Sequence, residues 1–245
     1  MIKRLIISLL IFIPLVSFSQ NVNNSDKLIP FPDSRTGKVG YGNAKLGVVV
    51  KPQFTSGGYD INGYYVVSKG KALEPDEKFA VIDRAGNYYI NFKEGYEFIA
   101  LGNEENKDLI MVKKKGKYGY IDYNKVVVIP LIYDNLGDFH AGLAYAEQGG
   151  KYGFINKKGE AAIDFAYEGA GDFRTLKSGE YYARVETNDK YGCINLKGEF
   201  IIPCEYDFIE TSQVNTIAAT KGDEIYHFDI NGKLEKKEKA QNNIK

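Results

Sequence analysis

The feature that most constrains the fold is an internal repeat. A motif of the form Lys-Tyr-Gly followed by an aromatic or Cys, Ile and an Asx residue occupies 117–122, 151–156 and 190–195. Two looser copies begin at Lys38 and Lys78, and a clipped sixth copy begins near Glu224, so that successive starts lie 40, 39, 34, 39 and 34 residues apart. Units of this length stack into arrays in which each unit contacts its neighbours.

Each unit reads as a β-hairpin with a third strand before it. The predicted turns begin with Asp or Asn and end with Gly, at 83–86, 156–159, 195–198 and 229–232. The Asx side chain caps a type I turn, and Gly takes the positive φ that follows. The preceding strands are expected at 64–68, 109–113, 142–148, 181–186 and 216–220. One repeat is therefore predicted to be a three-stranded antiparallel meander.

The turn also predicts which residues share a face of the meander. If its three-residue loop is closed by Asn156 and Glu160, alternation places one set of side chains on the core face: Gly153, Ile155, Ala161, Ile163, Phe165 and Tyr167. The opposite face, with Tyr152, Phe154 and Ala162, is still partly apolar. A register slip of one residue would exchange the faces. Because a lone meander cannot hide both, neighbouring repeats must stack on it.

The predicted fold class is all-β. Tandem three-stranded meanders stack in a curved solenoid or an open-propeller-like array over residues 37–235, as five repeats plus a partial sixth. The sequence leaves open whether the array closes.

These residues resemble the bacterial WG repeat, also called KWG. Its signature is Lys-Trp-Gly-Phe-Ile-Asp, a turn with Gly, Val-Ile-Pro, Tyr-Asp and then Phe-x-x-Gly-Leu-Ala, an order that 117–122, 128–130, 133–134 and 139–144 follow. Tyr118, Tyr152 and Tyr191 replace the Trp, which keeps the aromatic bulk. The resemblance covers roughly residues 38–234. It implies a tandem β-repeat module, usually exported or surface-associated, with no settled activity.

The N-terminus has the zones of a secretory signal peptide over residues 1–19. Lys3 and Arg4 precede a 12-residue apolar stretch, and small residues before Gln20 mark the expected cleavage point. That stretch is short of the roughly 20 residues needed to span a bilayer. We therefore predict an extracytoplasmic protein, periplasmic or secreted, with no membrane span after cleavage.

Charge excludes one class of partner. Removing residues 1–19 leaves 30 Lys and Arg against 32 Asp and Glu, a net charge of −2, which gives no general reason to bind nucleic acid. We interpret the basic run 113–117 as a solvated turn. Residues 20–36 are expected to be a flexible leader and 236–245 a polar tail.

Catalysis and cofactors are not expected. His140 and His227 are the only two histidines, too few for a His-rich metal site, and no nucleophile or phosphate-binding motif is present. The carboxylates recur at fixed repeat positions: Asp83, Asp122 and Asp229 as turn caps, Asp134 and Asp207 after the terminal Tyr, and Asp138 and Asp172 before a Phe. A cryptic paired-carboxylate hydrolase stays open as a third alternative.

The two cysteines are predicted to be free thiols. The pairing above puts Cys193 beside Tyr191 and Cys204 beside Ile202, on opposite faces of the sheet. Side chains that point apart cannot form a disulfide without a change of register.

Two functions from different classes follow. The first is a non-catalytic protein-interaction module that binds another envelope or surface protein through the repeats. The second is a glycan or cell-wall polysaccharide module using exposed aromatic rings, with candidate residues Tyr64, Tyr65, Tyr118, Tyr152, Tyr181, Tyr182 and Tyr191. Core or inter-repeat packing is the competing explanation for these rings, and their exposure discriminates between the two.

Overall fold

The computed structural model describes residues 26–210 and 216–239, and the predicted signal peptide lies outside them. Six small antiparallel sheets follow one another along the chain, here numbered I to VI. The one 3-10 helix among the named elements is η2 (Phe92–Glu94). The predicted all-β tandem array is therefore confirmed.

The strands of the first three sheets follow chain order. They are β1 (Ile29–Pro32), β2 (Val39–Asn43) and β3 (Gly47–Phe54) in sheet I; β4 (Ser56–Gly57), β5 (Tyr64–Lys69), β6 (Lys78–Asp83) and β7 (Tyr88–Ile90) in sheet II; β8 (Phe98–Leu101), β9 (Leu109–Lys114), β10 (Lys117–Asp122) and β11 (Val127–Tyr133) in sheet III.

The other three sheets repeat this order. They are β12 (Asn135–Leu136), β13 (Leu143–Gln148), β14 (Lys151–Asn156) and β15 (Ala161–Tyr167) in sheet IV; β16 (Gly169–Ala170), β17 (Arg174–Thr175), β18 (Tyr181–Thr187), β19 (Lys190–Ile194) and β20 (Phe200–Tyr206) in sheet V; β21 (Phe208–Glu210), β22 (Ile217–Lys221), β23 (Glu224–Phe228) and β24 (Leu234–Lys239) in sheet VI.

The expected count of three strands per repeat is too low. A short strand of two to four residues, such as β4 or β12, opens each of sheets II to VI, and β17 adds a fifth strand to sheet V. A strand this short has no period-two pattern to read in the sequence. It also links the repeats, because the chain passes directly from the last strand of one sheet to the first strand of the next.

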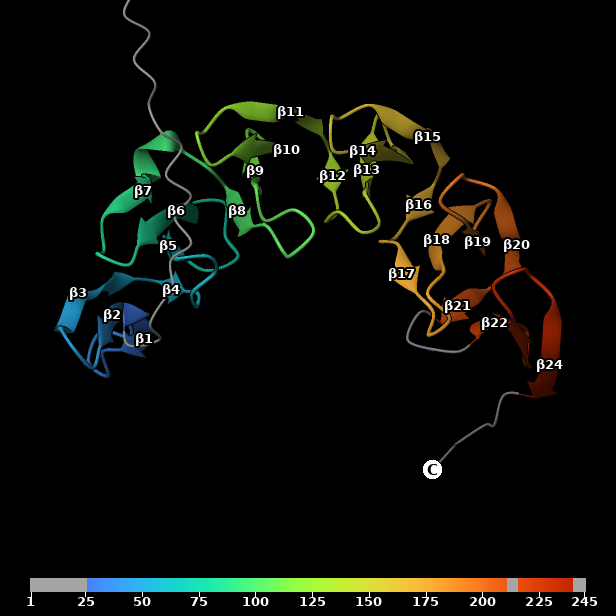
Figure 1. The fold of residues 1–245 in the computed structure, drawn as a ribbon, viewed down its shortest axis with the longest axis horizontal. Coiled ribbons are helices and arrows are strands. Elements are labelled where there is room, and N and C mark those ends of the chain that lie inside the picture. Colours follow the sequence, from blue (N-terminus) through green and yellow to red (C-terminus); the bar gives the residue numbers. More distant parts are fainter. Residues whose placement is uncertain (1–25, 211–215, 240–245) are drawn as a thin grey trace, which may run out of the picture.

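The sheets form an open arc (Figure 1). The last strand of each sheet, β3, β7, β11, β15, β20 or β24, lies on the convex outer side, and sheets I and VI lie at opposite ends of the arc. The array is thus curved and does not close. β1 falls inside the expected flexible leader and β24 extends into the expected polar tail, so both segments are partly strand.

The predicted Asx turns are present. One side-chain oxygen in each accepts hydrogen bonds from the backbone N–H groups two and four residues ahead, at 2.8–3.1 Å, in Asp83, Asp122, Asn156, Asn195 and Asp229. Gly159 follows with φ 79°. The recurrent carboxylates at these positions therefore act as turn caps.

The predicted core face is confirmed for Ile155 with Ala161 and Phe165, and it is wrong for Ile163 and Tyr167. Asn156 N–H donates to Glu160 O at 2.9 Å, which closes the expected loop. Beyond it the partners are Ile155↔Ala161, Phe154↔Ile163 and Tyr152↔Tyr167, so β15 carries extra residues as bulges. Ile163 therefore shares a face with Phe154, and its expected place beside Ile155 is wrong. Each bulge shifts the alternation by a residue.

The bulge explains the glycine of the motif. A Cβ on Gly119, Gly153 or Gly192 would lie 2.6–2.7 Å from the carbonyl oxygen of Ile129, Ile163 or Ile202 on the neighbouring outer strand. Nonbonded carbon and oxygen atoms do not approach so closely, so only glycine fits without movement. Ala80 stands at this position in sheet II, where β7 ends at Ile90 and has no bulged continuation.

Hydrophobic side chains fill each junction between adjacent sheets. The IV–V junction, for example, buries Phe154, Ile163, Phe173, Ala183 and Ile194. On the other face of sheet IV, Ala144 and Ile155 pack toward sheet III. The inner sheets thus bury both faces, which confirms that stacking of neighbours stabilises each repeat.

Candidate functional site

Sheet II departs from the repeat pattern at two buried positions. Tyr65 pairs with Ile82, whereas the equivalent residues of sheets III to VI are apolar and aliphatic: Ile110, Ala144, Ala183 and Ile217. Asp60 precedes the isolated bridge Ile61↔Tyr64, as Phe139 precedes the bridge His140↔Leu143. Phe139 is fully buried against Tyr120, with ring centroids 5.3 Å apart. A carboxylate and a phenol thus replace an apolar pair.

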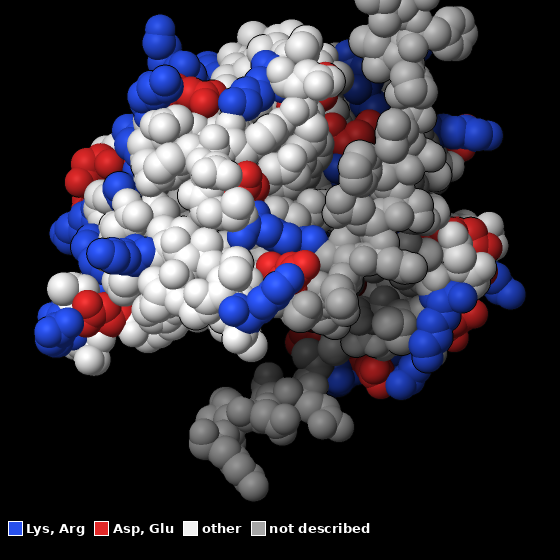
Figure 2. All heavy atoms as spheres, turned by 60° about the vertical axis from the view of Figure 1, so that its left-hand side comes forward, with Lys and Arg blue, Asp and Glu red and all other residues white. Residues whose placement is uncertain are grey.

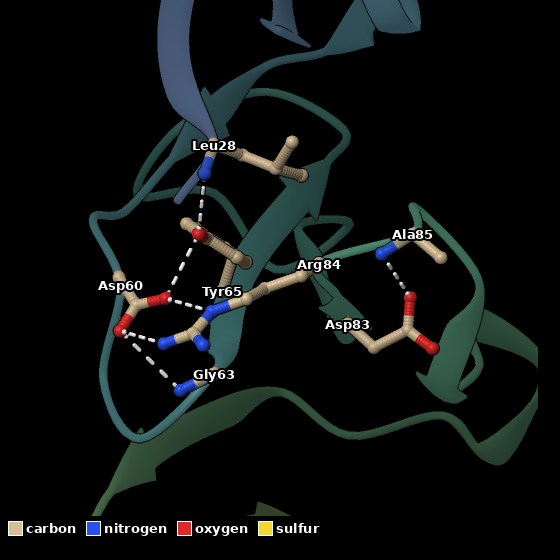
Figure 3. A network of polar contacts seen from close by, with 7 residues as sticks. All are labelled: Leu28, Asp60, Gly63, Tyr65, Asp83, Arg84 and Ala85. Carbon is tan, nitrogen blue, oxygen red and sulfur yellow. Dashed lines mark hydrogen bonds and ion pairs between the residues drawn. The ribbon is translucent and has the colours of Figure 1, made fainter. Parts of the chain in front are cut away.

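These side chains form a closed polar network (Figure 3). Asp60 Oδ2 accepts from Arg84 Nε at 2.8 Å and from the Tyr65 hydroxyl at 2.9 Å. Asp60 Oδ1 accepts from Arg84 Nη2 at 3.0 Å and from Gly63 N–H at 3.3 Å. Tyr65 in turn accepts from Leu28 N–H at 2.7 Å. The network joins the β4–β5 loop, the β6–β7 turn and the residue before β1.

Both members of the ion pair stay charged at ordinary pH. Burial raises the pKa of Asp60, but hydrogen bonds from Arg84 and Tyr65 and the Arg84 charge outweigh it and leave that pKa lowered. The hydrogen bond to Asp60 raises the pKa of Arg84. The side chains of Asp60 and Arg84 are only 10% and 24% exposed. This is the least exposed ion pair among those of the described residues.

An open hollow of about 1070 Å³ lies beside the network. Its walls come from the β4–β5 loop, the β6–β7 turn and the β8–β9 loop, and they include Asp60, Asn62, Tyr64, Arg84, Asn103 and Glu104. The half-buried Tyr64 ring packs on Tyr89 and Tyr123, at centroid distances of 4.7 and 5.4 Å. The hollow therefore combines an aromatic ring with amide, carboxylate and guanidinium groups.

Most of the tyrosines proposed for binding are packing residues. Tyr65 and Tyr182 are 0% and 1% exposed, so they cannot present a ring face to a ligand and leave the candidate set. Tyr118, Tyr152 and Tyr191 are half-buried against neighbours. Lys113 Nζ lies 4.7 Å from the Tyr118 ring, Tyr145 packs at 6.1 Å from Tyr152, and Arg184 lies 5.1 Å from Tyr191.

Of the remaining two, Tyr64 lines the hollow and Tyr181 lies in sheet V away from it. Asp60 and Arg84 were not predicted. The available signal was Asp60 standing where the Phe-x-x-Gly-Leu-Ala motif has Phe139.

The outer side of the arc is a second candidate surface. Exposed apolar side chains gather on the edge strand β11 and its turn: Val126, Val127, Val128 and Ile132, at 59%, 54%, 36% and 43% exposure. Leu46 and Val48 at β3, and Leu196 and Phe200 at β20, are exposed at corresponding places. Charges of both signs are scattered over the face in Figure 2, with no large area of one sign. We call the β11 set, Val126, Val127, Val128 and Ile132, the rim patch.

Asp138 and Asp172 lie close enough to interact. Burial raises the pKa of Asp172, His140 lowers it and Asp138 raises it. Asp172 Oδ1 is buried without a hydrogen-bond partner in the described part of the chain. Over residues 26–210 and 216–239, no group of three or more His, Cys, Asp or Glu is placed to hold a metal ion.

Asp134 and Asp207 have structural partners. Each pairs with the lysine that opens its own repeat, Lys117 or Lys190. Asp207 also accepts from Gly222 N–H at 2.8 Å, in the hairpin of the following sheet. These carboxylates join consecutive repeats.

Cys193 and Cys204 are free thiols on opposite faces, as predicted. Cys193 packs in the V–VI junction and Cys204 in the IV–V junction. The expected placement of Cys204 beside Ile202 is wrong, because the bulge in β20 leaves Ile202 on the Cys193 face. Burial raises the pKa of both thiols.

Comparison with protein families gives three consecutive matches to the WG containing repeat, at residues 118–152, 152–191 and 191–221. Residues 118–221 are WG containing repeats. The first two matches run from the aromatic residue of one motif to that of the next, and the third runs from Tyr191 in β19 to the end of β22 in sheet VI. The resemblance seen in the sequence is thereby confirmed for sheets III to VI. No curated protein matches the chain.

Solved structures similar to this array of sheets include Kluyvelomyces marxianus Hsv2, at 8% identity and TM-score 0.46, covering 79% of this chain and 66% of that one. The N-terminal domain of Nup159 matches at 11% identity and TM-score 0.40, covering 90% and 75%. A eukaryotic initiation factor matches at 10% identity and TM-score 0.49, covering 87% of this chain and 63% of that one.

The chain thus spans less than two thirds of the first of these structures and of the initiation factor. At such identities and TM-scores the likeness carries no inference about ligand, partner or activity. Within the described residues, no helix is long and apolar enough to cross a membrane.

Proposed function

We propose that the protein is an exported, non-catalytic repeat scaffold that binds another protein of the cell envelope through the rim patch. The observation that carries this proposal is the run of exposed valines at the middle of the arc. Val126, Val127 and Val128 are consecutive, and Ile132 lies on the same strand. Contiguous exposed apolar surface of this kind typically marks an interaction site.

The edge position of β11 favours a protein as the partner. One side of β11 pairs with β10, and β11 is the last strand of sheet III. Such an edge offers backbone groups for pairing with another chain. Pro130 interrupts the edge and limits uncontrolled strand addition. The signal peptide expected at residues 1–19 supports a partner outside the cytoplasm.

The test is cross-linking in cells with the tagged protein, followed by mass spectrometry, on two matched variants. Val127→Glu/Val128→Glu places charges in the rim patch. Ala161→Glu/Ala162→Glu places them at the equivalent exposed positions of β15. We expect a protein that cross-links to wild type and to the alanine variant but not to the valine variant.

Two outcomes contradict the proposal. One is a partner that the valine variant retains. The other is recovery of the protein with the wall or polysaccharide fraction and with no protein partner.

A further inference from the structure

The Asp60–Arg84 pair is not needed to pack the repeat. In sheet IV the places of Asp60 and Tyr65 are filled by Phe139 and Ala144, both buried, and Lys157 stands at the place of Arg84. Apolar groups of similar volume generally stabilise a fold as well as a buried ion pair, or better, because two charges must be desolvated. Sheet IV is therefore an internal control for sheet II. The stability of the fold alone does not explain why sheet II has polar residues where sheet IV has apolar ones.

The network instead fixes the wall of the hollow. Asp60 accepts from three separate residues, Tyr65, Arg84 and Gly63. Asn62 and Gly63 take φ 54° and 91°, so the loop turns tightly around the carboxylate. On the opposite wall Asn103 Oδ1 accepts from Glu105 N–H at 2.9 Å. Polar groups held in this way lose little conformational entropy when a ligand binds.

The charges of the hollow favour an uncharged ligand. Lys27 and Arg84 stand against Asp60, Asp83 and Glu104, and the Arg84 charge is already matched by Asp60. An anion or a cation would therefore meet nearly balanced groups. Planar carboxylate, amide and guanidinium groups can each pair with adjacent hydroxyls of a ligand. Tyr64 adds an aromatic surface suited to an apolar C–H face.

We propose that this hollow binds a neutral saccharide. Hydroxyl groups and an apolar C–H face in one uncharged molecule are the chemistry of a sugar ring. The hollow of about 1070 Å³ exceeds the common range for a single small ligand, which suits a short oligosaccharide. The site lies at the II–III junction, away from the rim patch, so it does not depend on the proposed protein partner.

One structural role of the network must be separated from binding. Tyr65 anchors Leu28 through its hydroxyl, and Tyr65 is fully buried behind the wall. Tyr65→Phe removes that anchor together with the hydrogen bond to Asp60, so this variant tests the support of the wall. Tyr64→Ala and Glu104→Ala alter the lining, and Glu104 is exposed and suited to truncation. Tyr181→Ala is the matched control, a half-buried tyrosine of sheet V.

The experiment is a microarray of neutral, amino and acidic oligosaccharides, followed by calorimetric titration of the strongest neutral binder. We expect Tyr64→Ala to weaken binding at least about tenfold and Glu104→Ala about threefold. Tyr181→Ala should stay within about twofold of wild type, and Tyr65→Phe, which removes one of the hydrogen bonds that fix Asp60, should weaken binding by less than Tyr64→Ala does. Far-UV circular dichroism and the melting midpoint verify that each variant is folded. If Tyr64→Ala is not folded, Glu104→Ala alone tests the lining of the hollow.

The proposal is overturned if no neutral oligosaccharide binds, if only acidic ones bind, or if the folded lining variants bind like wild type. Cross-linking through the rim patch is unaffected by any of these results.

Discussion

Sheets II and IV solve one packing problem in two ways. Both are four-stranded, run in chain order and end in an Asx turn before the outer strand. In sheet IV, Gly153 faces a bulged seven-residue β15. In sheet II, Ala80 faces β7, which has three residues and no such continuation. The glycine is therefore required only where a bulged outer strand lies against it. In sheet II the outer strand ends early, and Ala80 fits in place of the glycine.

The second difference concerns buried polarity. Phe139 and Ala144 keep this part of sheet IV apolar, whereas Asp60 and Tyr65, with Arg84, make it polar in sheet II. Sheet II thus holds an ion pair where sheet IV holds an aromatic ring. The comparison thus separates positions that maintain the array from positions available for binding.

The largest expected effect is at the glycine. Gly153→Ala should lower the free energy of unfolding by about 3 kcal/mol, because the new Cβ meets the Ile163 carbonyl. Ala80→Gly should cost about 1–2 kcal/mol, since it adds backbone freedom to the unfolded chain and removes one buried methyl group. Urea unfolding followed by circular dichroism measures both. Equal losses would break the proposed link between glycine and bulge.

The ion pair comes next. Arg84→Met leaves the Asp60 carboxylate buried and unpaired, and should cost about 2 kcal/mol, below the value for a fully buried pair because Arg84 is partly exposed. The triple variant Asp60→Phe/Tyr65→Ala/Arg84→Met installs the Phe and Ala of sheet IV and leaves no charge at position 84, so it should return to within about 1 kcal/mol of wild type. A triple variant no more stable than Arg84→Met would show that the two sheets are not interchangeable.

The same pair predicts a pH dependence. The folded-state pKa of Asp60 is lowered, so its contribution is complete above the unfolded value of about 3.9 and is lost as the pH falls through the folded value. Wild type should therefore lose more stability than the triple variant between about pH 5 and pH 2. Parallel curves for the two proteins would contradict this.

A smaller effect is expected at Asp172, whose carboxyl is buried without the partners that Asp60 has. Its pKa is raised, so stability falls as the pH rises from the unfolded value through the folded one. Asp172→Asn should raise the free energy of unfolding at pH 7 by about 0.5–1 kcal/mol. Asp164→Asn, at an exposed position of β15, is the control and should change it by less than about 0.5 kcal/mol.

The last prediction is that a reductant has no effect on the labelling of Cys193 and Cys204. A bulge in β15 puts Ile163 and Phe165 on opposite faces of sheet IV. The equivalent bulge in β20 puts Ile202, which pairs with Cys193, and Cys204 on opposite faces of sheet V. Alkylation of the unfolded protein should therefore modify both thiols whether or not a reductant is added, as read by mass. Modification only after reduction would mean that the register of sheet V differs from that of sheet IV.

The sequence by itself determined the array and its local chemistry. The spacing of the Lys-Tyr-Gly motifs and the Asx turns is local information, since each turn closes within five residues of its cap. The free cysteines and the turn-capping carboxylates followed from the same pattern.

The tertiary structure decided the rest, because it depends on contacts between repeats. The bulges reassigned Ile163, and short strands such as β12 turned a three-stranded unit into a four-stranded one. Asp60 and Arg84 are 24 residues apart and belong to different loops. Only the folding of sheet II brings them together beside Tyr64, since an ion pair of this kind leaves no periodic trace along the chain.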